Sequence, residues 1–147
     1  MASNTALLAE EARLWDELYH LVDTLPEARA TEPGYFEEGW SAKDLVAHIG
    51  SWLAEGGVCL ERIHAGTYRD DEIDIDAMNA RFYEAMRDVP LPTVKSQSAA
   101  ARTRMLHAWG ELEETPPEAV RWIAKAGPAH YAEHLPRLYE WVSQLGD

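Results

Sequence analysis

The chain has 147 residues, 46% of them hydrophobic, with 26 acidic against 13 basic side chains, one cysteine and a formal net charge of −13. That size and apolar content predict one folded domain over residues 1–147 and exclude a disordered chain, while the single cysteine excludes an intrachain disulfide. The negative charge argues against nucleic acid or an anionic membrane as partner, because both require clustered Lys and Arg.

Apolar residues recur at helical spacing along nearly the whole chain, and strand-like alternation is absent. The first predicted helix covers about residues 4–25 and ends at the proline that follows. A long loop is expected over residues 26–40. The second helix has the clearest start, because Ser41 can cap it and Asp44, three residues later, can complete a capping box. It should end near Gly66.

The second half of the chain begins with an acidic connection, residues 67–76. We interpret it as a solvated run of charge, because it lacks the glycine and terminal Glu of an EF-hand calcium loop. The further predicted helices are 76–87, 93–114, a short one at 118–125, and a last one that opens at Gly127-Pro128. Pro136 inside the last helix predicts a kink. Four long helices with one or two short ones predict an all-α four-helix bundle.

Three of the six histidines fail a test of helical phase and level. His20 and His107 each lie about 200° around their helices from the apolar residues two positions away, which predicts surface positions. His64 is nearer the apolar face of the second helix, but it lies roughly 24 Å along that helix from His48. None of these three is therefore a candidate for a shared site.

The other three histidines are predicted to meet. His130 and His134 lie on one face of a helix, roughly 5–6 Å apart at Cβ. His48 shares an apolar face with Leu45 and Trp52 in an early turn of its helix. In an up-down-up-down bundle the second and fourth long helices run parallel, so their early turns lie at one level. The trio then suits a divalent metal with an open coordination position; the alternative is a hydrogen-bonded core histidine beside an unrelated pair.

Residues His130 to His134 also spell H-x-x-E-H, the pattern of inverted zinc peptidases, in which the Glu is the general base. Those enzymes are far larger and take a distant third ligand, for which a bundle of this size has no room. Glu133 is therefore expected in solvent, with a supporting contact beside the metal site as the alternative.

Several side chains are candidates for a substrate pocket beside the histidines. Four aromatic residues suit its wall, with ordinary core packing as the alternative: Trp40, Trp52, Tyr131 and Trp141. Arg81 is the cationic candidate for holding an acidic substrate. Asn79 is a second polar candidate, although it could instead cap or hydrogen-bond locally. No residue is assigned a catalytic role from the sequence.

Three segments resemble the DinB-like superfamily, which includes the N-terminal domain of mycothiol-dependent maleylpyruvate isomerases and the ClbS/DfsB-type bundles. They are residues 39–49 (GWSAKDLVAHI), 78–82 (MNARF) and 130–136 (HYAEHLP). The resemblance implies a four-helix bundle with a divalent metal at one end. Its ligands, carried onto this chain, fall on the three histidines already selected by phase, His48, His130 and His134.

The resemblance also implies a function. It indicates a metal-dependent enzyme, a thiol-dependent transferase or isomerase or a hydrolase, that acts on a small molecule. Zn²⁺ is the expected ion, with Ni²⁺ or Fe²⁺ as alternatives, and a low-molecular-weight thiol is a further candidate cofactor. The competing hypotheses are a non-enzymatic small-molecule binding or self-resistance protein of the ClbS/DfsB type, and a structural module whose histidines only pack.

The family resemblance and the chain ends bear on the setting of the protein. Maleylpyruvate isomerases carry an additional C-terminal domain, so that reaction is not expected of this chain. A homodimer formed through the bundle faces is consistent with the family. Residues 1–8 show no export signal and no stretch approaches a membrane span, so a cytoplasmic location is expected.

Overall fold

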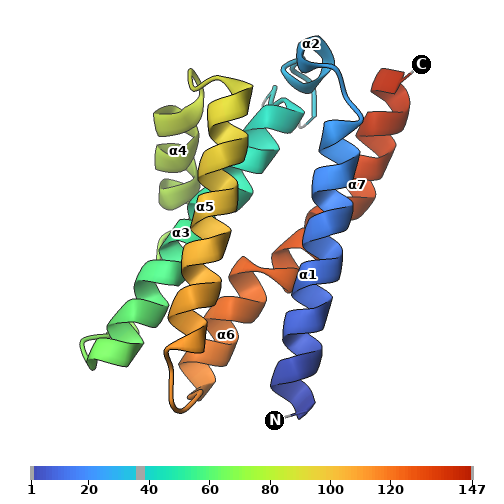
Figure 1. Ribbon diagram of the computed structural model, residues 1–147. Helices are drawn as coiled ribbons and strands as arrows, with labels where there is room; N and C mark the ends of the chain where they lie inside the picture. The colour runs from blue at the N-terminus through green and yellow to red at the C-terminus, as the bar shows by residue number, and fades with distance from the viewer. Residues whose placement is uncertain (1, 36–38, 147) are drawn as a thin grey trace.

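The computed structural model describes residues 2–35 and 39–146, and these ranges contain helices and no strand (Figure 1). The helices, in chain order, are α1 (Ala2–Asp23), α2 (Glu27–Ala30), α3 (Ala42–Ala65), α4 (Ile75–Met86), α5 (Leu91–Gly110), α6 (Pro117–Ala126) and α7 (Pro128–Gly146). The predicted four-helix bundle is confirmed: α1, α3, α5 and the consecutive pair α6–α7 form it. The expected loop over residues 26–40 contains α2, and residues 36–38 of it lie outside the described ranges.

Helices α3 and α5 run parallel, which contradicts the expected up-down-up-down order. Near their starts, the Ser98 hydroxyl donates to the Val46 carbonyl at 3.1 Å. Further along both helices, Arg104 forms two 2.7 Å contacts with the Glu61 carboxylate. The parallel order arises because α4 and its flanking segments carry the chain back along α3 before α5 begins (Figure 1).

Helices α1 and α7 also run parallel to each other, and opposite to α3 and α5. The Tyr131 hydroxyl of α7 donates to Glu11 of α1. About two turns further along both helices, the Tyr139 hydroxyl donates to Glu17. The bundle therefore runs up, down, down, up, with α6–α7 antiparallel to α3 (Figure 1). The sequence predicted that the early turns of α3 and α7 lie side by side, on the assumption that these helices are parallel. Since they are antiparallel, that assumption does not explain where along the bundle they meet.

The core is apolar and is contributed by every long helix. Its largest fully buried apolar side chains, together with two tyrosines, are Leu18, Val22, Tyr35, Leu45, Ile49, Leu53, Leu60, Met105, Ile123, Tyr131 and Leu138. α4 contributes no buried residue and lies on the outside of α3. None of the helices in the described ranges combines the length and the apolar character needed to cross a bilayer.

The start of α3 matches the predicted capping box. The Asp44 backbone N–H donates to the Ser41 hydroxyl at 3.2 Å, and the Ser41 N–H donates to the Asp44 carboxylate at 2.9 Å. The helix ends at Gly66, whose φ of +75° is left-handed. Both ends of the helix that carries His48 are therefore determined locally.

Removing the capping hydroxyl should destabilise the protein. Ser41→Ala leaves the Asp44 N–H without its acceptor, and we expect the free energy of unfolding to fall by about 1 kcal/mol. Urea unfolding followed by circular dichroism measures the change. Ser41→Thr keeps a capping oxygen and is the matched control; an equal loss in both variants would contradict the capping role.

Candidate metal centre and its cavity

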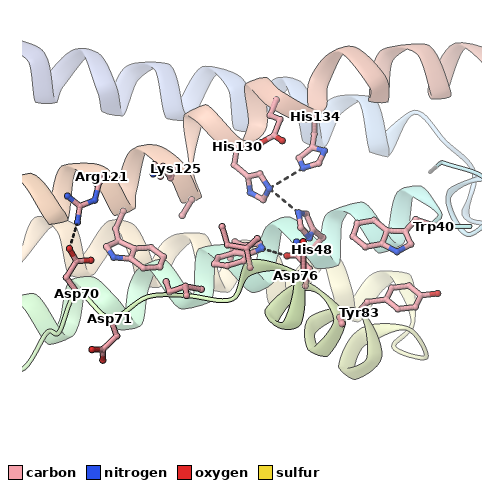
Figure 2. A pocket seen from close by; sticks show the side chains of 18 of the residues that line it. Trp40, His48, Asp70, Asp71, Asp76, Tyr83, Arg121, Lys125, His130 and His134 are labelled. Carbon is pink, nitrogen blue, oxygen red and sulfur yellow. Dashed lines mark hydrogen bonds and ion pairs between the residues drawn. The ribbon is translucent and has the colours of Figure 1, made fainter. Parts of the chain in front are cut away.

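Three imidazoles converge between α3 and α7 (Figure 2). The Nε2 atom of His130 lies 3.1 Å from that of His48 and 3.2 Å from that of His134. Each residue offers one ligand nitrogen, and the three atoms lie within 4.8 Å of one another. The structure thus brings together the three histidines that the sequence selected, although not by the parallel packing from which they were predicted.

The division of the last long helix into α6 and α7 explains why they meet. α6 packs beside the second half of α3, where a Cβ on Gly56 would lie 3.1 Å from the Ala126 Cβ. α7 then starts partway along the bundle, beside the earlier part of α3 that carries His48 (Figure 1). The first two turns of α7 therefore bring His130 and His134 to the level of His48.

Burial keeps these rings uncharged. Burial first, and then the neighbouring His134, lower the pKa of His48 from 6.5 to about 4. The pKa of His130 falls to about 3, first by burial and then through His48 and His134, with a smaller opposing effect of the Ala126 backbone. The pKa of His134 is also lowered by burial. Neutral imidazole is the form that binds metal.

Hydrogen bonding alone explains the cluster poorly. A neutral ring nitrogen either donates one hydrogen or accepts with one in-plane lone pair. The His130 Nε2 faces two other Nε2 atoms at hydrogen-bond distance, so it cannot satisfy both. A cation at the common point of the three Nε2 atoms would use all three lone pairs, so the donor set fits a divalent metal.

The metal-free protein should lose stability in mild acid. The unfolded chain holds these histidines at the ordinary pKa of 6.5, whereas the folded pKa values of His48 and His130 are about 4 and 3. Between these values the unfolded state binds more protons, so stability is complete above pH 6.5 and is lost as the pH falls toward 4. Urea unfolding at a series of pH values measures the slope. His48→Gln/His130→Gln should flatten it, and an unchanged slope would contradict the burial of neutral rings.

A cavity of about 1000 Å³ opens beside the three histidines, between α3, α4, α6 and α7 (Figure 2). Trp52 and Asn79, two of the pocket candidates, line it, and the Trp52 indole N–H donates to the Asn79 side chain at 2.7 Å. Trp40 also lines it and packs against the His48 ring at 5.2 Å between centroids. One wall of the cavity therefore continues into the histidine cluster.

The structure places three other candidates away from the cavity. Tyr131 is fully buried on the α1 side of α7, where its hydroxyl donates to Glu11 at 3.0 Å. Arg81 is exposed on α4 and does not line the cavity. Trp141 packs against Tyr35, 6.4 Å between ring centroids. Tyr131 and Trp141 therefore pack against other parts of the bundle, and Arg81 faces solvent.

From the sequence, the remaining lining residues had no place at a pocket, except for Glu133, for which a supporting contact beside the metal site was the alternative. Aromatic ones are Tyr68, Tyr83 and Trp122, and charged ones are Asp70, Asp71, Asp76, Arg121, Lys125 and Glu133. Several belong to the acidic connection that was interpreted as solvated charge. Asp70, Asp71 and Asp76 are exposed, whereas Tyr68 is half-buried. The Tyr68 hydroxyl accepts from the Trp122 indole at 2.9 Å, and Asp70 pairs with Arg121 at 3.3 Å. The connection lines the cavity because it packs on α6, a tertiary contact that has no local signal in the sequence.

These features define a class of protein: an up-down-down-up helical bundle with a partly buried three-histidine cluster beside a ligand-sized cavity. The profile of the family described as mycothiol maleylpyruvate isomerase N-terminal domain matches residues 12–142, so the chain belongs to this DinB-like family. No match is found among curated proteins.

A solved structure shares the fold. The crystal structure of an uncharacterised protein from Escherichia coli UTI89 aligns with a TM-score of 0.78 at 14% sequence identity. The alignment covers 94% of this chain and 91% of that chain. At this identity the likeness concerns the fold alone.

Proposed function

We propose that the chain is a divalent-metal-dependent enzyme that acts on a small molecule, as a thiol-dependent transferase or isomerase or as a hydrolase. The observation that carries the proposal is the convergence of three neutral Nε2 atoms beside a cavity of about 1000 Å³. Three imidazoles suit Zn²⁺ best, with Ni²⁺ or Fe²⁺ as alternatives. The family name, which includes mycothiol, favours a low-molecular-weight thiol as the second cofactor.

The chain's own residues would bind the metal ion and orient its ligands. His48, His130 and His134 would bind the ion and leave its other positions toward the cavity. Such an ion lowers the pKa of a bound water or thiol, which supplies a nucleophile at neutral pH. Trp40 packs on His48 and stacks on Tyr83, 5.7 Å between centroids and 7° apart in plane. This stack keeps water from one side of the His48 ring and holds its orientation.

A non-enzymatic binding or self-resistance protein is the second candidate. The cavity has a volume at the upper end of ordinary ligand pockets, roughly 300–1000 Å³, and Trp40, Trp52 and Trp122 contribute to its walls. Aromatic walls of this kind bury a small organic molecule whether or not a metal is present. The two candidates differ in whether the bound molecule is transformed and whether the metal is required.

Metal exchange coupled to an activity screen separates these candidates. Untagged protein is stripped with a chelator, reloaded with Zn²⁺, and offered an activated ester, an epoxide and an activated alkene, each with and without a low-molecular-weight thiol. We expect turnover that requires the metal and is lost in His48→Ala but kept in the control His20→Ala. Stoichiometric binding of a test compound without turnover, equal in the stripped protein, would favour the binding protein.

A further inference from the structure

A buried polar network lies where α7 packs against α1 and α5. The Glu11 carboxylate, 1% exposed, receives two 2.7 Å contacts from the Arg102 guanidinium. The Tyr131 hydroxyl donates to the same carboxylate at 3.0 Å. Because Glu11 lies on α1, Arg102 on α5 and Tyr131 on α7, three helices of the bundle are tied together at one point.

Stability alone gives little reason for this network. Burying an ion pair costs desolvation free energy that offsets most of the attraction, and apolar residues of similar volume often serve as well. What a satisfied buried network adds is direction, because hydrogen bonds hold only at defined positions of the helices. The network is therefore better explained by what it positions.

Tyr131, which the network holds on α7, adjoins the candidate metal ligands. Tyr131 directly follows His130 and precedes His134 by three residues, so all three lie within the first turns of the same helix. A 20° rotation of a helix moves a side-chain atom about 6 Å from its axis by roughly 2 Å. Metal sites tolerate displacements of their ligand atoms of only about 0.5 Å. The rotation of this turn about its axis must therefore be held closely for the trio to share an ion.

The start of α7 is not held by a continuous helix, because the break between α6 and α7 falls at Gly127. A Cβ on Gly127 would lie 2.8 Å from the Ile123 carbonyl oxygen and 3.4 Å from the Glu11 Cγ. Glu11 therefore lies beside the break and, through its carboxylate, accepts from Tyr131. This one residue of α1 is next to the segment both at its start and one turn later.

We propose that Tyr131 is a positioning residue for the histidine cluster: the Glu11–Arg102 pair holds its hydroxyl and thereby sets the rotation of the first turn of α7. The effect on metal binding rests on the proposed function, whereas the effect on histidine geometry does not. Tyr131 acts from the side of α7 that faces α1, about 100° around the helix from His130, and it does not line the cavity.

The test removes only the hydroxyl. Tyr131→Phe keeps the ring, and we expect Zn²⁺ affinity, measured by chelator competition, to fall about 10- to 100-fold, the usual effect of losing a supporting contact. The visible absorption of the Co²⁺-loaded protein should change in the same variant. Tyr19→Phe is the matched control, because the Tyr19 hydroxyl donates instead to the Lys95 carbonyl at 2.8 Å, a hydrogen bond between α1 and α5. Urea unfolding of both variants corrects for stability.

A metal-independent measurement separates this inference from the proposed function. Long-range ¹H–¹⁵N spectra of the apo protein report the imidazole nitrogens, and those of His130 and His134 should shift in Tyr131→Phe but not in Tyr19→Phe. If the wild-type protein takes no metal, the proposed function fails and these spectra alone decide the inference. Unchanged imidazole resonances, or metal affinity and Co²⁺ spectra equal in the two variants, would overturn the positioning role.

Discussion

His130→Ala is expected to abolish tight metal binding. His130 is the central member of the cluster, because its Nε2 atom lies 3.1 and 3.2 Å from the other two. Its loss leaves two ligands, and we expect Zn²⁺ affinity to fall by more than about 100-fold, beyond the effect of losing a supporting contact. Competition with a chromophoric chelator measures the dissociation constant.

The same variant should change folding stability far less than metal affinity. Without a metal, the buried His130 Nε2 faces two other ring nitrogens and can hydrogen-bond with only one of them, and an unsatisfied buried polar group itself costs about 1–3 kcal/mol. Removing the ring also removes this cost, which offsets part of the stability that is lost with the packing of the ring. His64→Ala, an exposed histidine late in α3, is the control and should keep the affinity of the wild type. Tight one-to-one Zn²⁺ binding by His130→Ala would contradict the assignment of the ligands.

Gly50→Ala should give the largest loss of stability among the small substitutions considered. A Cβ at this position would clash with the Ser98 hydroxyl and lie 2.9 Å from the Ser98 Cβ and 3.0 Å from its Cα. The last of these atoms is backbone, so α3 and α5 must move apart. We expect the free energy of unfolding to fall by about 1–3 kcal/mol, the usual cost of overpacking a core.

A second glycine provides the matched comparison for Gly50. Nothing lies within 4 Å of a Cβ built on Gly110, at the end of α5. Gly110→Ala should therefore stabilise the protein slightly, by up to about 1 kcal/mol, through helix propensity. Urea denaturation measures both variants. Equal effects at Gly50 and Gly110 would contradict the close packing of α3 on α5.

Local rules predicted the helices well, because their signals lie within a few residues. Ser41 and Asp44 mark the start of α3 through side chains that bond to neighbouring backbone groups. Pro116-Pro117 and Gly127-Pro128 likewise mark the starts of α6 and α7 closely. What these signals do not contain is direction in space, so the bundle order was assigned wrongly.

The histidine cluster was predicted correctly from a partly wrong premise. Helical phase, a local property, correctly placed His48 on an inward face and His130 with His134 on one face. The level was argued from parallel helices, whereas α3 and α7 are antiparallel (Figure 1). The trio still meets because the chain breaks at Gly127 and α7 begins partway along the bundle. The sequence showed that break but not its consequence.

The cavity was the least predictable part. Trp52 and Asn79 line it, but Tyr131 and Arg81 do not. A helical wheel cannot say which of two flanking directions faces a neighbour, and Tyr131 lies only about 100° from His130 around the helix. Nor does composition show that an exposed acidic connection packs on α6 through Tyr68 and Asp70. Such contacts depend on the route of the whole chain.

X-ray absorption at the zinc edge, on untagged protein loaded with one equivalent of Zn²⁺, tests the central claim most directly. The account predicts three imidazole nitrogens at about 2.0–2.1 Å with a water oxygen completing the shell, and the loss of one imidazole in each of the three single His→Ala variants. A shell with one imidazole or none, unaffected by replacing His48, His130 or His134, would contradict it.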